Sequence, residues 1–273
     1  MRFGRYYELA IGLGDRAVQI KPPINIVFSC DKSISGGLNK LNIKIYNLKE
    51  DSRNKLVKDT DSATYIPIQL KIGYNNKADL IFKGNVQTGS TTKEGVNYIS
   101  NLECYDGGFT YSTASISTTA KSNQVITNSL LKSLKGLDIG LINKKFSYLR
   151  PKVLCGNPLD ILKNVLDSDE EIFIDNERIY ILNKNQVVGT YTPLVNAKSG
   201  LLNIPQRQQR VTSFITVINP TLRLGGLFSL VSKNAKFVNG VYKMISCNYT
   251  GEYVGNDWKQ SVTGLLQGEY NRL

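Results

Sequence analysis

The chain has 273 residues, 41% of them hydrophobic and 21% charged, which is enough to bury the core of one large domain or two smaller ones. Its 34 basic and 22 acidic residues give a net charge of +12, which attracts polyanions or acidic partner proteins at low salt without choosing between them. Because lysines and arginines are scattered along the chain, a solvated basic surface explains the same charge.

The opening segment MRFGRYYELAIGLG has only a short apolar run, too brief for the core of a signal peptide. No stretch approaches the roughly 18 to 20 apolar residues that a membrane span needs. We therefore expect a soluble protein that does not insert into a membrane. Four cysteines stand apart in apolar or strand-like segments, which favours buried, reduced thiols over disulfides. These are Cys30, Cys104, Cys155 and Cys247.

Alternating apolar residues predict three strands in the first third of the chain. One buried face recurs over residues 24–30, a second over 41–45 and a third over 66–72. Between the second and third strands, KEDSRNKLVK predicts one short capped helix. A further strand, DLIFKGNV, follows the GYNNKAD turn. This order predicts a small β-barrel that ends near residue 108.

The middle of the chain, residues 109–188, changes character. SNQVITNSLLKSL predicts an amphipathic helix, because Ser122 can cap it and apolar residues recur after it at four-residue spacing. A second helix is predicted at Pro158, which suits the first helical position. EIFIDNERIYIL then predicts a hairpin that turns at Asp175-Asn176. This part is expected to be a small α/β insert.

In the last part of the chain, alternation returns in VTSFITVI, GLFSLVS, VYKMISCNYTGEY and WKQSVTGLL, with turns at Asn239-Gly240 and Gly255-Asn256. The sequence therefore predicts a mainly β (α+β) protein. Two small antiparallel β-barrel-like domains, residues 1–108 and 189–273, would flank the α/β insert at 109–188.

No catalytic, cofactor-binding or metal-binding residue is predicted. The chain has no histidine, which excludes Ser-His-Asp and Cys-His catalysis and leaves only isolated cysteines for zinc. IGLGDRA resembles a dinucleotide fingerprint, but AVQIKPPINI after it is unsuited to a helix, so a strand turn is favoured. The acidic run at 167–171 lacks the pattern of a calcium-binding loop, and a solvated turn is favoured. We expect a protein that is not an enzyme and needs no cofactor.

Two segments resemble the baseplate or tail hub proteins of tailed phages and related contractile injection systems. The first is LNKLNIKIYNLKEDSRNKL with IQLKIGYNNKADLIFKGNV, and the second begins at INPTLRLGGLFSL and runs through GNDW to QSVTGL. Gly225 departs from the family pattern, because a proline is more usual there. The positions that match the family's motifs are Tyr46, Asn47, Leu48, Arg53, Gly73, Tyr74, Gly84, Pro220, Arg223, Gly226, Gly240, Asp257 and Trp258.

This resemblance implies a structural virion protein that forms a homotrimer. Two similar barrels in each of three subunits would make a pseudo-sixfold ring, which joins the sixfold tail tube to a threefold central spike or tip. The tape-measure protein and DNA would pass through its channel, so we expect the positive charge to lie mainly on the outer faces. Assembly would take place in the cytoplasm of the bacterial host. Pro220 would shape a turn into a strand, with Arg223 bracing it, facing a neighbour or doing neither.

Two other functions stay open. Tyrosines and lysines interleave in KIYNLK and YKMISCNY, as they would on a stacking platform of a basic nucleic-acid-binding β-barrel. The inside and outside of a half-buried strand produce the same alternation. A cell-wall hydrolase would need two carboxylates a few ångströms apart, and these could be recruited from many positions.

Overall fold

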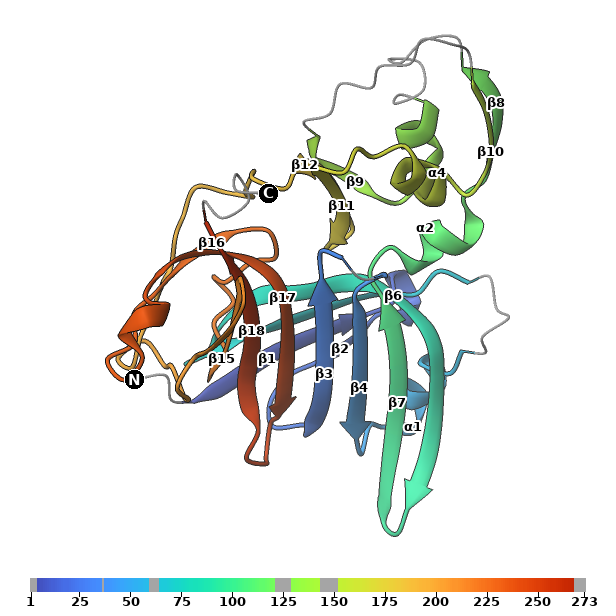
Figure 1. Ribbon diagram of the computed structural model, residues 1–273. Helices are drawn as coiled ribbons and strands as arrows, with labels where there is room; N and C mark the ends of the chain where they lie inside the picture. The colour runs from blue at the N-terminus through green and yellow to red at the C-terminus, as the bar shows by residue number, and fades with distance from the viewer. Residues whose placement is uncertain (1–3, 36, 59–63, 121–128, 143–151, 268–273) are drawn as a thin grey trace.

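The computed structural model describes residues 4–35, 37–58, 64–120, 129–142 and 152–267. The protein is mainly β, with 53% strand and 12% helix, which confirms the predicted fold class. Among the described residues, thirteen strands form one large sheet, and two smaller sheets of two and three strands lie in the middle part of the chain. Figure 1 shows the large sheet below and the middle part stacked on one end of it.

The first part of the chain contributes one half of the large sheet. Its strands follow the order β3-β4-β7-β6-β5-β1-β2. The three alternating segments form strands with the predicted buried faces, and the short helix is confirmed, although its N-cap residue makes no side-chain bond. The elements are β1 (Arg5–Ile11), η1 (Gly14–Arg16), β2 (Val18–Ile20), β3 (Ile26–Ser33), β4 (Lys40–Tyr46), α1 (Glu50–Lys55), β5 (Pro67–Tyr74), β6 (Lys77–Glu94) and β7 (Asn97–Tyr105).

The insert contains the two small sheets and short helices. Residues 129–133 are helical, and the predicted cap Ser122 lies outside the described residues. The second helix begins as predicted, with the Asn157 side chain accepting the Leu159 N–H at 2.9 Å. The predicted hairpin is present but turns one residue later, at Asn176-Glu177. The elements are α2 (Gly108–Thr113), β8 (Ile116–Ala120), β9 (Asp138–Ile142), β10 (Lys152–Gly156), α4 (Pro158–Asn164), β11 (Glu170–Asp175) and β12 (Arg178–Asn183).

The last part of the chain contributes the second half of the large sheet. All four alternating segments form strands. Asn239-Gly240 ends the connection between two of them, and the side-chain oxygen of Asn239 accepts the Ser232 N–H at 2.7 Å. The elements are β13 (Leu194–Val195), β14 (Gln206–Gln208), β15 (Val211–Val217), β16 (Leu227–Leu230), η2 (Lys236–Val238), β17 (Gly240–Glu252) and β18 (Trp258–Leu266).

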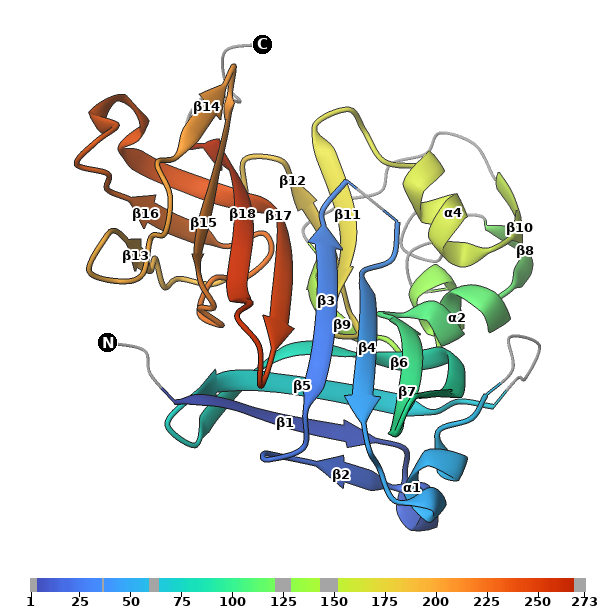
Figure 2. The same cartoon turned by 90° about the horizontal axis from the view of Figure 1, so that it is seen from below.

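One antiparallel pairing joins the two halves, between β17 and β3. The described strand pairs form one open sheet from β14 to β2 (Figure 2), so closed barrels are not confirmed. One apolar core runs through both halves, and a second lies inside the insert. The predicted boundaries at residues 108 and 188 stay a prediction. Three cysteines are buried as expected, but Cys155 is exposed, because it lies on β10 of a two-stranded sheet.

The two halves repeat one strand order. The first reads β3-β4-β7-β6-β5, and the second reads β14-β15-β18-β17-β16. The long strands β6 and β17 each carry a bulge, after Val86 and after Met244. Aligning the bulges superposes the pair Lys93 and Tyr98 on the pair Gly251 and Trp258. Each half therefore contains one copy of the same sheet unit.

Candidate functional site

Five neighbouring strands, β18, β17, β3, β4 and β7, form a wall that spans both halves (Figure 1). Side chains alternate between its faces, and one face packs into the core through residues such as Phe28, Leu41 and Val262. The opposite face is rich in serine, threonine and asparagine. Apart from Lys243, which the insert covers and Glu171 pairs, its charged residues are three lysines and three acids, which sum to zero. They are Asp31, Lys40, Lys44, Glu103, Glu252 and Lys259.

Part of the charge on this open wall face is paired locally. Lys40 pairs with Glu103 at 2.6 Å on the neighbouring strand, and the hydrogen bond from Lys40 lowers the pKa of the Glu103 carboxyl. Asp31 accepts a hydrogen bond from the Asn248 amide at 2.5 Å. The face therefore offers hydroxyls, amides and paired charges, and it lacks the cationic stripe that binds a nucleic-acid backbone.

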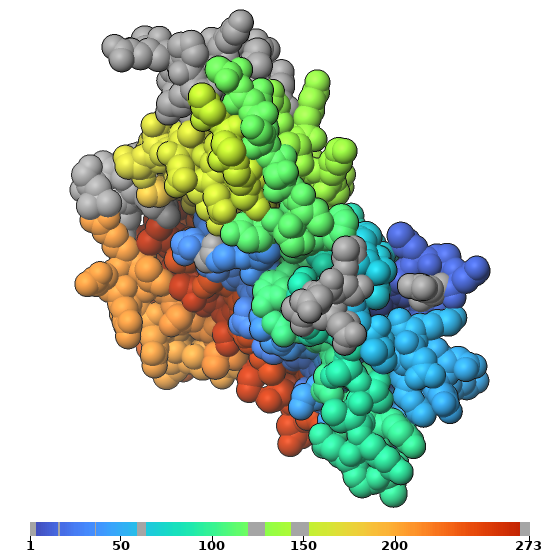
Figure 3. Space-filling model, turned by 90° about the vertical axis from the view of Figure 1, so that its right-hand side faces the viewer, coloured from blue at the N-terminus to red at the C-terminus, as the bar shows by residue number. Residues whose placement is uncertain are grey.

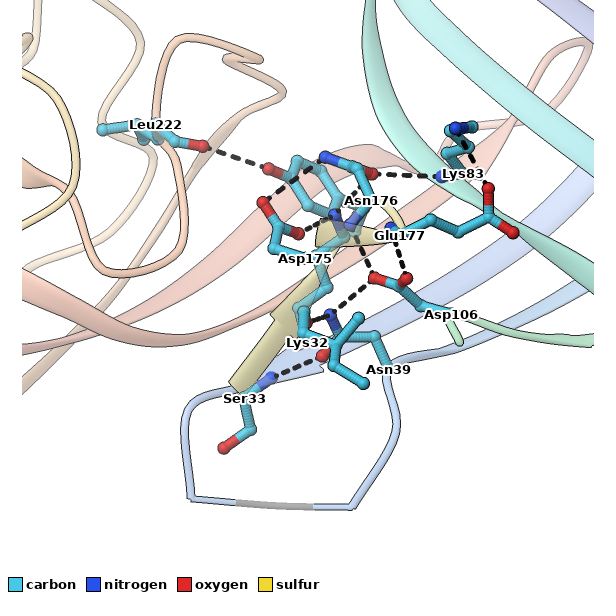
Figure 4. Close-up of polar contacts among 11 residues, drawn as sticks. Lys32, Ser33, Asn39, Lys83, Asp106, Asp175, Asn176, Glu177 and Leu222 are labelled. Atoms are coloured by element: carbon cyan, nitrogen blue, oxygen red, sulfur yellow. Dashed lines mark hydrogen bonds and ion pairs between the residues drawn. The ribbon is translucent and has the colours of Figure 1, made fainter. Parts of the chain in front are cut away.

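A buried polar junction holds the insert against the first half of the sheet (Figure 4). The turn between β11 and β12 reaches Asp106, which follows β7. The Asp106 carboxylate accepts the N–H groups of Asn176 and Glu177, each at 2.6 Å. Asn39 donates its amide to the same carboxylate at 3.2 Å. Both central turn residues have positive φ, 56° and 58°, as a two-residue hairpin turn requires.

The charges of this junction compensate each other. Lys32, on β3, pairs with Asp175 at 2.5 Å, and both side chains are largely buried. Burial alone would lower the pKa of Lys32, but Asp175 and Asp106 raise it above its usual value. Burial raises the pKa of Asp106 to about 7, opposed in part by Lys32. Removing either Lys32 or Asp175 would leave its partner as an uncompensated buried charge.

A second ionic contact holds the insert against the other half. Lys243 on β17 pairs with Glu171 on β11, and both side chains are buried. Lys243 also donates to the Lys184 carbonyl at 3.1 Å. Burial raises the pKa of Glu171, which Lys243 opposes. The prediction of a solvated turn at 167–171 is thus wrong for Glu171, because the hairpin packs against β17 at that point.

Within the part of the chain that the structure describes, no group of three or more His, Cys, Asp and Glu side chains could hold a metal ion. No described helix is long and apolar enough to cross a membrane. The described residues thus form a neutral polar wall and two ionic junctions. A comparison with protein-family models matches residues 7–253 to the family described as Baseplate hub gp41. The chain belongs to this baseplate hub family.

The hub family is a structural, non-enzymatic family of phage tail proteins. Its membership implies a place in the virion tail. The resemblance inferred from the sequence motifs is confirmed. A search of curated proteins found no significant match.

Solved structures share the hub's fold at low sequence identity. The tail protein from Neisseria meningitidis MC58 matches with a TM-score of 0.67 and 6% identity, over 97% of this chain and 98% of that one. The 43 kDa tail protein of prophage MuSo2 from Shewanella oneidensis matches with a TM-score of 0.65 and 8% identity, over 96% of this chain and 98% of that one. The E. coli c3393 protein matches with a TM-score of 0.62 and 8% identity, over 90% of this chain and 75% of that one. It is described as a type VI secretion component with structural similarity to the T4 tail proteins gp27 and gp5.

The first hub motif forms a brace at the β6–β7 hairpin. Asn47, with φ of 54°, bonds the Tyr98 backbone in both directions, at 2.8 and 3.0 Å. Arg53 stacks over the Tyr98 ring at 4.0 Å and also donates to the Leu48 carbonyl at 3.5 Å. Tyr46 ends β4 beside this brace. Sequence reasoning found Asn47 and Arg53 but missed Tyr98, which no local pattern singles out.

Three further motif positions lie where β5 and β6 pair. Gly73 faces Ala78 in a tight hairpin, and any side chain on Gly73 would collide with the Lys77 carbonyl. Tyr74 pairs with Lys77 at the hairpin's end, and Gly84 faces Ile68 further along. The two glycines are required because neighbouring backbone approaches closely, at Gly73 from Lys77 and at Gly84 from Tyr105. The sequence shows this only as a glycine within a strand.

The last motif forms a second brace, at the β17–β18 hairpin. Trp258 packs edge-on against Phe28 at 5.6 Å between ring centroids, and the Arg5 guanidinium lies over Trp258 at 5.6 Å. Arg5 also donates to the Gly255 carbonyl at 2.5 Å. Asp257 pairs with Lys259 at 2.8 Å, and Gly240 opens β17. Sequence reasoning missed Arg5, because its partners lie about 250 residues away in the chain.

The turn at INPTLRLGG lies at the meeting point of all three parts. Pro220 and Arg223 line a hollow of about 230 Å³, together with Lys83 of the first part and Arg178 of the insert. Gly225 has φ of 73°, which proline cannot adopt, and this explains the departure from the family pattern. Gly226 follows, and its N–H bonds the Arg223 carbonyl at 3.0 Å. The motif therefore shapes the turn, and Arg223 is exposed beside it.

Proposed function

We propose that three copies of this hub form a pseudo-sixfold ring that joins the sixfold tail tube to a threefold central spike or tip. Family membership supports the hub role, and the repeated strand order of the two halves is the observation that supports a pseudo-sixfold ring. Three chains with two like units each supply six units around one axis. Tube and spike proteins would be the partners above and below, with assembly in the host cytoplasm.

The intrachain pairing of β17 with β3 is the model for the contact between copies. The equivalent strands are β6 and β14. The edge of β6 that faces away from β7 pairs with β5 only as far as Asn85, and beyond that point the described residues add only the bridge of Lys58 to Gly89. β14 is the last strand of the sheet and pairs with β15 alone among the described strands. Open edges of this kind accept another strand. Residues 90–94 of one copy would pair with residues 204–208 of the next, which repeats the internal contact around the ring.

The open wall face would then line the channel. Its paired charges and small polar side chains suit the passage of the tape-measure protein and of DNA, because a strongly cationic lining would hold phosphate groups in place. This fits the expectation that the excess positive charge lies on other faces.

The mass in solution tests the ring. Light scattering on the purified chain should give 3 × 30.4 = 91.2 kDa, at low and high salt, with ring-shaped particles in negative stain. A particle that stays at 30.4 kDa at every concentration, alone and with the tube and spike proteins of the same tail, would contradict the proposal.

A further inference from the structure

We infer that the tips of the β6–β7 and β17–β18 hairpins form the surface that docks onto the sixfold tail tube. This inference rests on the proposed ring and names the residues that would meet one partner. Figure 1 shows both hairpins ending at the same edge of the wall, while the insert lies at the opposite edge. Figure 3 shows the β6–β7 hairpin projecting beyond the rest of the molecule.

The number of features at each edge fits the symmetry of the partners. Every chain carries two hairpin tips at one edge and one insert at the other. A ring of three chains therefore displays six tips at one end and three inserts at the other. Only the tip end can present equivalent contacts to a sixfold partner, because the insert has no counterpart in the second half.

The two tips are built alike. At each hairpin an arginine from another element lies over an aromatic ring at the start of the returning strand. Arg53 of α1 lies over Tyr98 at 4.0 Å, and Arg5 of β1 lies over Trp258 at 5.6 Å. Tyr98 and Trp258 occupy matching register positions when the bulges are aligned. Arginines held over aromatic faces fix the direction of both hairpins before a partner binds.

Each tip presents one valine to solvent. Val96 is 89% exposed and Val254 is 69% exposed. Charged side chains flank them, Lys93 and Glu94 at the first tip and Glu252 at the second. A single exposed valine is common on a protein surface. One valine at each of two equivalent tips, however, would give both tips the same apolar contact with a sixfold partner. The partner should therefore carry six apolar sockets with polar rims.

Capture of the tail tube protein encoded by the same genome tests this docking surface. The substitutions Val96→Asp and Val254→Asp place a charge in each socket, and we expect each to weaken capture about tenfold or more and the pair to abolish it. Val153→Asp is the matched control, because Val153 is 75% exposed on β10 of the insert. It should leave capture unchanged.

A second readout does not depend on the effect of a new charge. Val96→Cys and Val254→Cys, each in a Cys155→Ser background, should label rapidly with a maleimide and become protected when the tube protein is added. Unchanged labelling together with unchanged capture by the Asp variants would overturn the docking surface while a 91.2 kDa ring remains. Loss of the ring in the unaltered chain would instead contradict the proposed function.

Discussion

Residue-scale chemistry fixes how the insert sits on the sheet. Lys32 with Asp175 holds one side of the hairpin, and Lys243 with Glu171 holds the other. Burying such pairs costs about as much desolvation as their attraction returns, so they contribute little net stability. They specify orientation instead, because any other placement of the hairpin would leave buried charges without partners.

Asp106→Asn should change how stability depends on pH. The folded-state pKa of Asp106 is about 7, against an ordinary 3.8, so the folded protein binds more protons than the unfolded chain between these values. The contribution of this carboxyl to the free energy of unfolding therefore falls as pH rises through that window. Asparagine resembles the protonated carboxyl and lacks this dependence.

Relative to the unaltered protein, we expect the free energy of unfolding of the variant to rise by up to about 1.4 kcal/mol per pH unit between about pH 4 and pH 7. Above pH 7 the difference should stay constant. Urea unfolding followed by the fluorescence of Trp258, the single tryptophan, measures this difference across the pH range. Parallel profiles for the two proteins would show that Asp106 does not titrate in this window.

At the scale of elements, periodicity predicted what depends on neighbouring residues. The buried faces at 41–45 and 66–72, the helix at 50–55 and the hairpin of β11 and β12 all follow from local alternation or capping. The length of β6 was missed, because QTGSTTKE has no apolar alternation and is held by its pairing with β7. The join between β17 and β3 and the two ionic junctions link distant residues, which no local pattern encodes.

A disulfide should form between copies at the proposed edge contact. When the bulges of β6 and β17 are aligned, Thr92 of the first half occupies the position of Thr250 in the second half. Gln206 of β14 likewise occupies the position of Ser29 of β3, because the two residues pair with equivalent residues of β15 and β4. Thr250 and Ser29 face each other in the β17–β3 ladder. We therefore expect Thr92→Cys with Gln206→Cys, in a Cys155→Ser background, to give covalent trimers on oxidation.

Denaturing gels without reductant would show those trimers. Thr92→Cys with Ser168→Cys is the control, because Ser168 lies on the exposed turn before β11 and should give no closed trimer. Equal cross-linking by both pairs, or a monomer band alone from the first pair while the ring persists in solution, would place the contact between copies elsewhere.

For the whole molecule, the decisive property is where the charge lies. The chain carries +12, yet the open wall face sums to zero. A basic nucleic-acid-binding protein would gather lysines on one face, whereas a channel lining has to release DNA. If the wall lines the channel of the proposed ring, this placement of lysines favours the hub function over a nucleic-acid-binding barrel.

Removing lysines from two faces measures this separation. Lys40, Lys44 and Lys259 lie on the wall, and a triple change to serine there should leave the salt dependence of DNA binding unchanged. The matched triple at Lys198, Lys233 and Lys236, which are exposed on the last part of the chain, lowers the net charge equally. Each phosphate contact contributes about 0.9 to the magnitude of the slope of log K against log salt. Replacing Lys198, Lys233 and Lys236 should therefore reduce that slope by up to about 2.7. If the wall variant lost that slope instead, the wall would be a DNA-binding face and the channel lining would be wrong.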